Sequence, residues 1–349
     1  MSETVILSQS LYEDLAIAIS ECSHDRLFVL TDTTTHRLCW PLLEPFVGLR
    51  QATHIVIGAT DTHKTLDTLS YVWQSLGEGG ATRHSCMLCL GGGMVTDLGG
   101  FAASTFKRGI DYINIPTTLL SMVDASVGGK TGINFNGLKN EVGVFAEPQR
   151  VIIHTPFLST LDQENIRSGY AEMLKHGLIA DSGTWAELLD FDLAQPDLDL
   201  LQQMVGRSVA VKERIVEQDP HERGIRKALN LGHTVGHAFE SWAMRHGQPI
   251  LHGYAVAYGL LCELYLSCLL TGFPTDKMRG TVGYIREYYG QLPITCDDYP
   301  ELLELMRHDK KNIAGTINFT LLADIGDIRI NQTATKADIE EALDFMREG

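Results

Sequence analysis

The sequence lacks an excess of basic residues. Its 349 residues include 28 lysines and arginines against 44 aspartates and glutamates, so the formal net charge at pH 7 is −16. This balance argues against a general binder of nucleic acids or anionic membranes, because both attract positively charged proteins. An anionic substrate would therefore need a locally basic pocket.

The sequence predicts neither a membrane-spanning helix nor a secretory signal peptide. The chain has no uninterrupted apolar run of the roughly 18 residues that a membrane-spanning helix needs. The N-terminus, MSETVILSQS, has neither the basic start nor the apolar core of a signal peptide. The seven scattered cysteines, an odd number, indicate reduced thiols and a cytoplasmic protein. Cys86 and Cys89 form a CxxC inside the apolar run CMLCL, which favours buried strand residues over a redox pair.

The order of apolar patterns predicts two domains. In the first part, short apolar runs alternate with helical patterns such as 65–76, which is typical of a parallel α/β sheet. The predicted strands cover residues 26–30, 53–59, 85–93, 111–116 and 150–155. Helical patterns dominate afterwards. We predict an α/β N-terminal nucleotide-type domain at 1–157 and a mostly α-helical C-terminal domain at 158–349.

Two local signals refine the second domain. The residues from Thr160 to Gln163 fit a capping box that opens a helix reaching Ile179. The run TINFTLLADIG at 316–326 predicts a strand or a hairpin.

A glycine-rich turn lies in LGGGMVTDLGGFAAST, residues 90–105. It follows a predicted strand and opens a helix, where backbone N–H groups and the helix dipole favour a pyrophosphate. Gly91 and Gly93 fit the usual dinucleotide fingerprint, but Thr96 stands at its third glycine. A tight structural turn is the alternative.

A second glycine stretch is SVGGKTGIN, residues 126–134. Lys130 follows Gly129 as in a P-loop, but Asp124 stands where that motif needs a glycine. With Lys139 and Asn140 close behind and Arg108 upstream, groups that can bind phosphate are concentrated here. The alternative is a solvated basic loop.

The segment LNLGHTVGHAFE, residues 229–240, has two histidines four residues apart. If one helix runs from about Gly224 to His246 and ends at Gly247, one face holds Arg226, Asn230, His233 and His237. Such a polar stripe on an apolar helix needs partners: a metal, an anionic substrate or acidic neighbours. Both histidines as metal ligands, one ligand with a second role, and plain core residues all remain open.

Further ligands of a metal would come from other segments. Glu172 in SGYAEMLKHG lies three residues before Lys175, and His252 begins LHGYAVAYG. Glu172, His233 and His252 would form a two-histidine, one-carboxylate set suited to zinc or a similar divalent ion, with positions open for substrate oxygens. His176 is a competitor, but helical geometry points it away from Glu172.

Seven segments in order resemble the 3-dehydroquinate synthase family, over roughly residues 55–330. They are GGGMVTDLGGFAASTFKRG, IPTTLLSMVDASVGGKTGIN, LKNEVGVF, SGYAEMLKHGLI, LNLGHTVGHAFE, LHGYAVAYG and HDKKNIAG. The resemblance implies an N-terminal NAD-binding α/β domain and a C-terminal helical metal-binding domain. It also implies conversion of 3-deoxy-D-arabino-heptulosonate 7-phosphate to 3-dehydroquinate and phosphate, in the shikimate route, with catalytic NAD⁺ and a divalent ion, Zn²⁺ or Co²⁺.

The resemblance also implies residue roles. The metal ligands would be Glu172, His233 and His252. The phosphate would meet Lys130, Asn140, His237, Lys311 (with Lys310 close behind) and Arg108. In this family the residue that matches Arg108 tends to come from a neighbouring subunit, which implies a homodimer. The substrate carboxylate and ring hydroxyls would meet Lys175, Lys212, Arg226, Asn230 and Asp124. His237 and Glu222 match positions of proton transfer.

The cofactor contacts follow in the same way. The residues that match are Gly91, Gly92, Gly93, Asp97, Thr117, Thr118, Lys139 and Thr160. On the adenosine side the chain departs from the family: the pattern D-x-N reads Asp32-Thr33-Thr34, and G-E-x-x-K leaves Asp61 and Lys64. These departures put the ribose and adenine contacts in doubt, but not the use of NAD.

Three other functions compete with this one. A sister cyclase would act on a sugar phosphate without a carboxylate, against which Arg226, Asn230, Lys212 and His237 argue. A metal-dependent polyol dehydrogenase would release NADH. A catalytically dead NAD- or metal-binding protein would be expected to have lost site residues, and none is lost.

Overall fold

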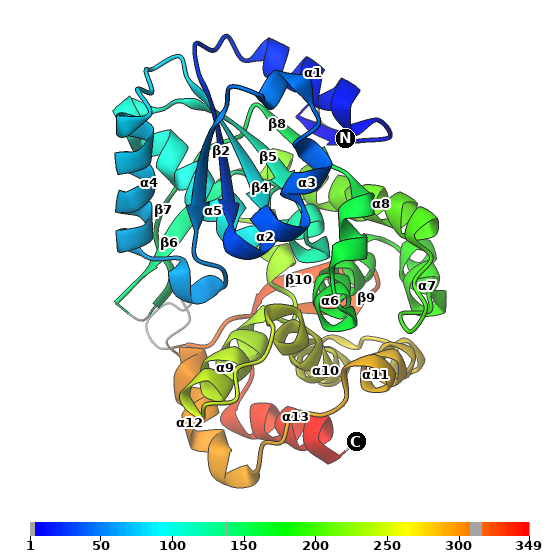
Figure 1. Ribbon diagram of the computed structural model, residues 1–349. Coiled ribbons are helices and arrows are strands. Elements are labelled where there is room, and N and C mark those ends of the chain that lie inside the picture. The colour runs from blue at the N-terminus through cyan, green and yellow to red at the C-terminus, as the bar shows by residue number, and fades with distance from the viewer. Residues whose placement is uncertain (1–3, 137, 308–315, 349) are drawn as a thin grey trace. The chain divides into compact units, whose positions relative to one another are not determined.

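The computed structural model describes residues 4–136, 138–307 and 316–348 (Figure 1). The chain forms two compact units: the first comprises Met1–Asp162 and Leu198–Glu213, and the second Gln163–Asp197 and Arg214–Gly349. The division predicted after residue 157 differs from this one chiefly in helix α8 (Leu198–Gln218), which begins in the first unit and ends in the second.

Six parallel strands form the sheet of the first unit. In spatial order they are β1 (Val5–Leu7), β8 (Arg150–Ile153), β5 (Asp111–Pro116), β4 (Cys86–Gly91), β2 (Leu27–Asp32) and β3 (Thr53–Ile57). β4 is buried along its whole length, which is typical of a strand inside a parallel sheet. All five predicted strands are confirmed. β1 was missed because three residues are too few to show a pattern.

The strand order places a topological switch point between β2 and β4. From β2 the chain proceeds to β3 on one side, and from β4 it proceeds to β5 on the other. In open parallel sheets, ligands bind beyond the carboxyl ends of the strands at this point. Those ends are Asp32 and Gly91, two of the predicted cofactor residues.

Helices α4 (Leu66–Glu78) and α5 (Gly93–Thr105) pack on the sheet of the first unit. Their core residues follow helical spacing: Leu69, Val72 and Leu76 on α4, and Val95 and Leu98 on α5, all fully buried. The other helices are α1 (Leu11–Glu21), α2 (Thr33–Leu38) and α3 (Trp40–Leu43).

An antiparallel hairpin follows the second glycine stretch. It joins β6 (Lys130–Phe135) to β7 (Leu138–Phe145). The sequence analysis identified groups that can bind phosphate here, with a solvated basic loop as the alternative. It missed the strands, because the glycines obscure the alternation of side chains. β7 is exposed throughout.

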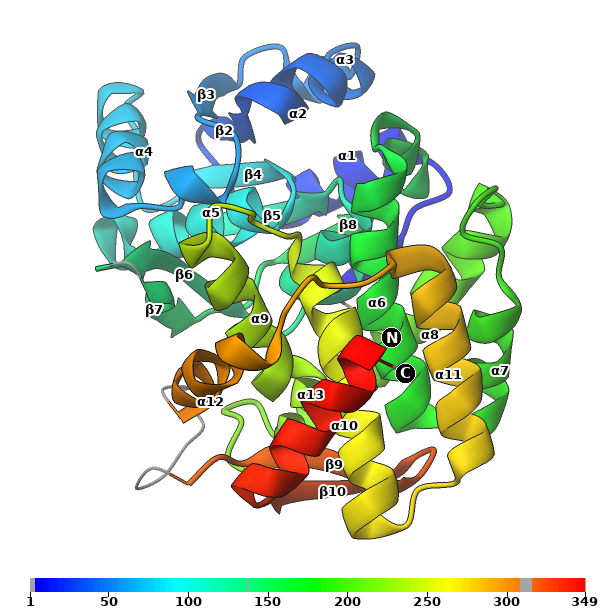
Figure 2. The same ribbon diagram turned by 90° about the horizontal axis from the view of Figure 1, so that it is seen from below.

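Helices dominate the second unit (Figure 2). They are α6 (Gln163–Ala180), α7 (Ser182–Asp190), α9 (His233–Arg245), α10 (His252–Thr271), α11 (Thr275–Tyr289), α12 (Tyr299–Arg307) and α13 (Lys336–Glu348). α10 packs against α6, α9, α11, α13 and the strand β9 (Phe319–Asp324). It is long and apolar enough to cross a membrane, but 72% of its apolar window is buried, as in the core helix of a soluble protein.

Three predictions for the second unit can be scored. The run at 316–326 begins a hairpin of β9 and β10 (Asp327–Gln332), as predicted. The α9 helix ends before Gly247, which has a φ of +70°, also as predicted. The capping box at Thr160 is wrong: α6 begins at Gln163, and the Thr160 hydroxyl donates to the carbonyl of Phe157 within a 3₁₀ turn.

The single helix predicted from Gly224 to His246 is also wrong. The segment Ile225–Asn230 is a 3₁₀ turn, and α9 begins only at His233. The break lies at Gly232, whose φ of +78° is a left-handed conformation that glycine adopts without strain. Arg226 and Asn230 therefore do not share an α-helical face with the two histidines.

Candidate functional site

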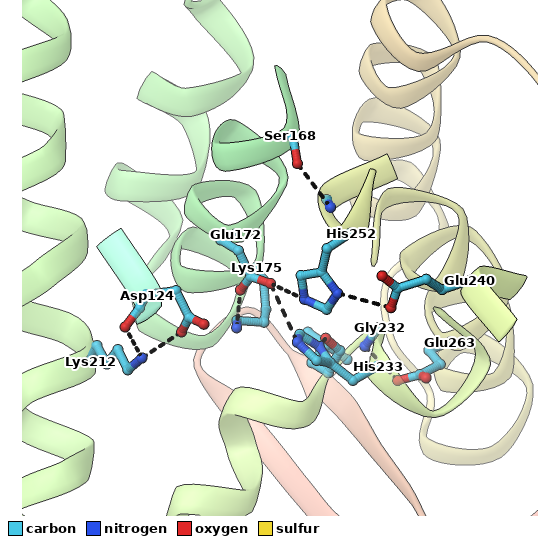
Figure 3. A network of polar contacts seen from close by, with 12 residues as sticks. Asp124, Ser168, Glu172, Lys175, Lys212, Gly232, His233, Glu240, His252 and Glu263 are labelled. Atoms are coloured by element: carbon cyan, nitrogen blue, oxygen red, sulfur yellow. Dashed lines mark hydrogen bonds and ion pairs between the residues drawn. The ribbon is translucent and has the colours of Figure 1, made fainter. Parts of the chain in front are cut away.

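Three residues from three helices of the second unit converge on one point (Figure 3). Glu172 lies in the middle of α6, while His233 and His252 are the first residues of α9 and α10. The Nε2 atoms of His233 and His252 lie 3.3 and 3.4 Å from Oε1 of Glu172. All three ligand atoms lie within 4.8 Å of one another. The expectation that His176 points away from Glu172 is wrong: a ring nitrogen of His176 also lies within 4.8 Å of a carboxylate oxygen of Glu172, because residues four apart on a helix share a face.

This arrangement fits a divalent metal ion. Ligand atoms about 2.1 Å from a tetrahedral metal lie roughly 3.4 Å from one another, which matches the two nitrogen–oxygen distances. Oε1 of Glu172 is buried and has no hydrogen-bond partner among the described residues. A buried acceptor without a partner is costly, and a cation at this point would satisfy it. Two imidazoles and a carboxylate are a donor set that suits Zn²⁺ or Co²⁺.

The second oxygen of Glu172 is occupied by a lysine. Oε2 forms an ion pair with Nζ of Lys175, one turn further along α6, and both side chains are buried. Burial opposes ionisation of Glu172, but Lys175 and His233 outweigh it and hold the pKa of this carboxyl well below its usual range. Glu172 is therefore a carboxylate with one oxygen neutralised and the other aimed at the histidines.

Each histidine is oriented through its other ring nitrogen. Nδ1 of His233 lies 3.0 Å from the carbonyl of Leu231, and Nδ1 of His252 lies 3.3 Å from Oε2 of Glu240. Burial lowers the pKa of His233 to about 4, so its ring is neutral. Burial also opposes protonation of His252, but its contacts with the carboxylates of Glu172 and Glu240 outweigh it and raise the pKa to about 10. The partners of Nδ1 direct both Nε2 atoms toward Glu172.

His237 lies next to this cluster and is less buried than His233. One turn along α9, its ring centroid is 5.3 Å from that of His233 and 5.9 Å from that of His252. It is partly exposed, whereas His233 is buried. The structure thus separates the two histidines of the motif into a buried one that faces Glu172 and a more accessible neighbour.

A loop before α9 holds the other predicted residues of this unit. Asp219 accepts hydrogen bonds from the backbone N–H groups of Arg223, Gly224 and Arg226 at 2.9, 2.6 and 3.1 Å. These bonds, with that of Arg223 the strongest, lower the pKa of Asp219.

Asp219 thereby shapes the loop that presents the predicted substrate residues. Arg226 is buried, and its Nη1 donates to the carbonyl of Pro220 at 2.5 Å. Glu222 accepts a hydrogen bond of 2.8 Å from Nδ2 of Asn230. Glu222, Arg226 and Asn230 are thus brought into one loop.

In the first unit, the predicted cofactor residues gather beyond the switch point of the sheet. Asp32 caps α2, accepting from the N–H groups of Thr34 and Thr35 at 2.7 and 2.9 Å. The turn of residues 91–93 leads from β4 into α5, with Gly92 as the capping residue. The N–H of Thr117 donates to the carbonyl of Gly91 at 3.0 Å. The start of α5 and these strand ends form a turn of the kind that binds pyrophosphate.

Two further residues that were predicted to contact the cofactor lie in the same unit. The methyl group of Thr118 would lie 3.1 Å from a Cβ at Gly92, so the two residues are neighbours. Thr160 is a neighbour of Cys39, with 3.7 Å between their side-chain oxygen and sulfur atoms.

Lys64, a buried lysine, joins helix α5 to the β6–β7 hairpin. Nζ of Lys64 lies 2.6 Å from Oδ2 of Asp97 and also donates to Oδ1 of Asn140. Burial raises the pKa of Asp97, and Lys64 opposes that rise. At the rim, Lys139 lies 3.5 Å from Asp61, an exposed ion pair. The structure therefore groups Asp61, Lys64, Asp97 and Lys139, which were predicted to contact NAD, with Asn140, which was predicted to contact the substrate phosphate.

The remaining predicted residues of the first unit lie at three places. Nζ of Lys212 in α8 lies 2.6 Å from Oδ1 of Asp124 and 2.5 Å from its carbonyl oxygen. Lys130 is exposed at the start of β6. Arg108 is exposed in a turn where Lys107, Arg108 and Gly109 all have positive φ, at 50°, 72° and 115°. Lys310 and Lys311 fall outside the described residues.

Sequence reasoning missed several residues that hold the site in place. Asp219 holds the loop before α9, and Glu240 contacts His252. Glu263 of α10 accepts a hydrogen bond from the N–H of Gly232, just before α9. Asn134 of β6 donates to Oδ2 of Asp61 at 3.0 Å. Only Asp219 has a local signal, because an aspartate before Pro220 and Gly224 is typical of a side-chain-capped turn. The others act across helices or strands that the sequence does not place together.

The CxxC of the first unit is structural, as predicted. Cys86 and Cys89 are buried in β4, and all seven cysteines are free. Burial raises the pKa of the Cys89 thiol far above its usual value.

Comparisons with known proteins cover the whole chain. A family model described as 3-dehydroquinate synthase N-terminal matches residues 54–168, and one described as 3-dehydroquinate synthase C-terminal matches residues 169–312. A 3-dehydroquinate synthase of Parabacteroides distasonis is 55% identical over 349 residues, covering 100% of this chain and 99% of that protein. One from Streptococcus pyogenes serotype M3 is 36% identical over 346 residues, covering 98% and 96%.

Solved structures show the same fold. The 2-epi-5-epi-valiolone synthase of Streptomyces hygroscopicus, with NAD⁺ and Zn²⁺ bound, has a TM-score of 0.84 and 27% identity, covering 98% of this chain and 96% of that one. A 2-deoxy-scyllo-inosose synthase complexed with carbaglucose-6-phosphate, NAD⁺ and Co²⁺ has a TM-score of 0.86 at 22% identity, covering 99% and 96%. From the two family models and the full-length relatives, the chain belongs to the 3-dehydroquinate synthase family.

Proposed function

We propose that this chain converts 3-deoxy-D-arabino-heptulosonate 7-phosphate to 3-dehydroquinate and phosphate, with NAD⁺ and a divalent metal ion. The observation that carries the proposal is the 55% identity to a 3-dehydroquinate synthase over the full length of both chains. The convergence of Glu172, His233 and His252 supports it, because that chemistry needs a Lewis acid beside a carbinol.

The metal would be held by Oε1 of Glu172 and Nε2 of His233 and His252. When bound, it supplies the acidity of a coordinated hydroxyl and polarises the ketone derived from it. Lys175 keeps the other oxygen of Glu172 neutralised, so the carboxylate stays ionised at neutral pH. The same lysine is a donor for a substrate hydroxyl that comes within reach of the cluster.

NAD⁺ would bind at the switch point of the sheet in the first unit. When bound, it supplies a reversible hydride acceptor. The N–H groups at the start of α5 would meet its pyrophosphate. Asp32, Thr34, Asp61 and Lys64 would lie toward the ribose and adenine. Asp32, Asp61 and Lys64 already have protein partners, so they would contact the cofactor while keeping or exchanging those bonds.

Charge decides which part of the substrate each residue holds. Lys130 and Arg108 are exposed cations suited to the phosphate, with Asn140 and Lys311 as further donors. Arg226 and Lys212, both buried, suit the carboxylate. Asp124 holds Nζ of Lys212 in place. Asn230 holds Glu222 by a hydrogen bond. Glu222 and the partly exposed His237 would transfer protons.

The test is a phosphate-release assay with the purified protein. We expect release from the heptulosonate phosphate with no net NADH absorbance, and far slower release from sedoheptulose 7-phosphate or glucose 6-phosphate. Steady accumulation of NADH without phosphate release would instead identify a polyol dehydrogenase. Faster release from a substrate without the carboxylate would identify a sister cyclase.

We also propose that the enzyme works as a homodimer in the cytoplasm. The seven free cysteines support a reducing compartment. The exposed Arg108, held in a turn of left-handed residues, supports a role toward a neighbouring copy. Mixing inactive Arg108→Ala and His233→Ala chains would restore part of the activity if Arg108 acts in trans, because one site of each mixed dimer would be intact. No recovery in mixed dimers would show that it acts in its own chain.

A further inference from the structure

Helices α9 and α10 pack against each other so closely that their backbones touch. A Cβ at Gly259 of α10 would lie 2.0 Å from the carbonyl oxygen of Gly232 and 2.7 Å from the nitrogen of Gly236. A residue larger than glycine at Gly259 would therefore push the helices apart. The start of α9 faces the later part of α10, and Glu240 faces the start of α10. The two helices are thus antiparallel, and each one begins with a histidine of the cluster.

Each helix also supplies a glutamate to the beginning of the other (Figure 3). Oε2 of Glu240, from α9, lies 3.3 Å from Nδ1 of His252. Glu263, from α10, accepts a hydrogen bond of 2.6 Å from the N–H of Gly232 and one of 3.1 Å from the N–H of Val235. Glu240 thus holds the ring of His252, and Glu263 holds the backbone on both sides of His233.

The bonds to Glu263 match what the start of a helix needs. The first N–H groups of an α-helix have no partner within the helix, and the helix dipole favours a negative charge there. Glu263 is fully buried, so its charge-assisted bonds form away from water, where they are strong. One carboxylate satisfies two N–H groups and fixes the direction in which α9 starts.

That direction determines where His233 points. Gly232 has a left-handed conformation, and the Nδ1 atom of His233 lies 3.0 Å from the carbonyl of Leu231. With Gly232 and Val235 held by Glu263, the segment from 231 to 235 has little freedom. Nε2 of His233 consequently stays 3.3 Å from Oε1 of Glu172, the buried oxygen without a hydrogen-bond partner among the described residues.

We propose that Glu240 and Glu263 are positioning residues that hold the two histidine ligands through this reciprocal arrangement of α9 and α10. Glu240 acts on the ring of His252, and Glu263 acts on the backbone that carries His233. The inference rests on the proposed metal role of Glu172, His233 and His252. Glu240 and Glu263 would then set part of the metal affinity without contacting the ion.

The test measures metal affinity, because a purely structural role would change only stability. Zn²⁺ affinity of the metal-free protein is measured by competition with a chromophoric chelator, and Co²⁺ absorption in the visible range reports the ligand geometry. Both are recorded at a temperature where each variant is fully folded by circular dichroism. Glu263→Gln keeps the volume but places an NH₂ group against a backbone N–H, and Glu240→Gln removes the charge facing His252.

We expect each variant to bind Zn²⁺ about 10- to 100-fold more weakly, as is found when partners of ligating histidines are removed. The Co²⁺ spectrum should shift as well. Ser267→Ala is the matched control. Its buried hydroxyl donates to the carbonyl of Glu263 and accepts from the N–H of Leu322, so its loss removes hydrogen bonds from α10 without touching the start of α9. It should lower the melting temperature and leave the Zn²⁺ affinity unchanged.

Unchanged Zn²⁺ affinity in Glu263→Gln and Glu240→Gln, with a lower melting temperature alone, would overturn the inference. An equal loss of affinity in Ser267→Ala would also overturn it, because the effect would then be general loosening. The proposed function fails separately, if the wild-type protein binds Zn²⁺ and phosphate is nonetheless not released from the heptulosonate phosphate. If Glu263→Gln does not fold, Glu263→Asp and Glu240→Gln give the same two readouts.

Discussion

The two units prepare their predicted ligand groups in opposite ways. In the second unit, Nε2 of His233 and His252 converge on an oxygen of Glu172 that has no hydrogen-bond partner among the described residues. In the first unit, Lys64 is already bonded to Asp97 and Asn140. The candidate metal cluster therefore keeps a buried acceptor that a cation would satisfy, whereas Lys64, Asp97 and Asn140 of the first unit satisfy one another.

This difference fits the two kinds of ligand that we propose. A metal ion needs converging side-chain atoms, which lose their function if the protein pairs them off. A dinucleotide can be held mainly by backbone N–H groups at the start of a helix, so the side chains around it are available to stabilise the fold. We expect substitutions in the cluster to affect activity most and those in the first-unit network to affect stability most.

The largest expected effect is loss of a metal ligand. His233→Ala should reduce kcat/KM by about 1000-fold, since metal catalysis contributes several kcal/mol to the barrier. Treatment with EDTA should inactivate the wild-type protein, and Zn²⁺ or Co²⁺ should restore it but not the variant. The control is His246→Ala, an exposed histidine just after α9, which should keep full activity. Full activity in His233→Ala would refute its ligand role.

The next effect concerns the network of the first unit. Lys64→Met leaves Asp97 without its cation in a largely buried place, so the free energy of unfolding should fall by about 3 kcal/mol. Urea denaturation measures this loss, and Lys64→Met/Asp97→Asn should recover part of it. Lys139→Met is the matched control, because its pair with Asp61 is exposed and contributes little. A larger loss of stability in Lys139→Met than in Lys64→Met would contradict the view that the buried pair stabilises the first unit more than the exposed pair does.

A smaller effect concerns the loop of Asp219 and its pH dependence. Backbone hydrogen bonds lower the pKa of Asp219 in the folded protein below its value in the unfolded chain. Its contribution to stability is therefore fully present above the unfolded pKa of about 3.9 and is lost as pH falls through the lower folded pKa. Asp219→Asn should flatten the acid side of the stability profile, measured by thermal melts from pH 6 to about 3. It should also raise KM for the heptulosonate phosphate more than it lowers kcat, and an unchanged KM would show that the loop does not position substrate residues.

The smallest effect is expected at the cysteines. Cys296 is exposed, whereas Cys86 and Cys89 are buried and the thiol pKa of Cys89 is raised. A thiol reagent should modify Cys296 quickly and leave the β4 pair intact in the folded protein. Activity should not change, and Cys296→Ser should abolish the fast phase. Fast modification of Cys86 or Cys89 would mean that the sheet next to the glycine turn opens readily.

The sequence predicted the sheet and the metal candidates for different reasons. Strands such as β4 and β5 are apolar runs that remain buried, so their pattern survives folding. Glu172, His233 and His252 come from three separate segments. Their chemistry suggested a two-histidine, one-carboxylate set, and the family resemblance implied the same three ligands. The helix from Gly224 was predicted wrongly because side-chain periodicity continues across Gly232, where the backbone turns.

Contacts across elements were beyond sequence reasoning. Glu263 meets Gly232 and Val235 only because α9 and α10 are antiparallel, and nothing local to Glu263 indicates this. The pairing of Lys64 with Asn140 likewise depends on the β6–β7 hairpin, which the glycines concealed.

The break at Gly232 makes the second unit modular. The loop of residues 219–230 is anchored by Asp219, and α9 is anchored separately by Glu263. Because the two anchors are independent, a change in the loop need not be transmitted to His233. Under the proposed function, selectivity for a sugar acid would depend on the loop and metal affinity on the start of α9. The loop could then be exchanged for another without moving His233.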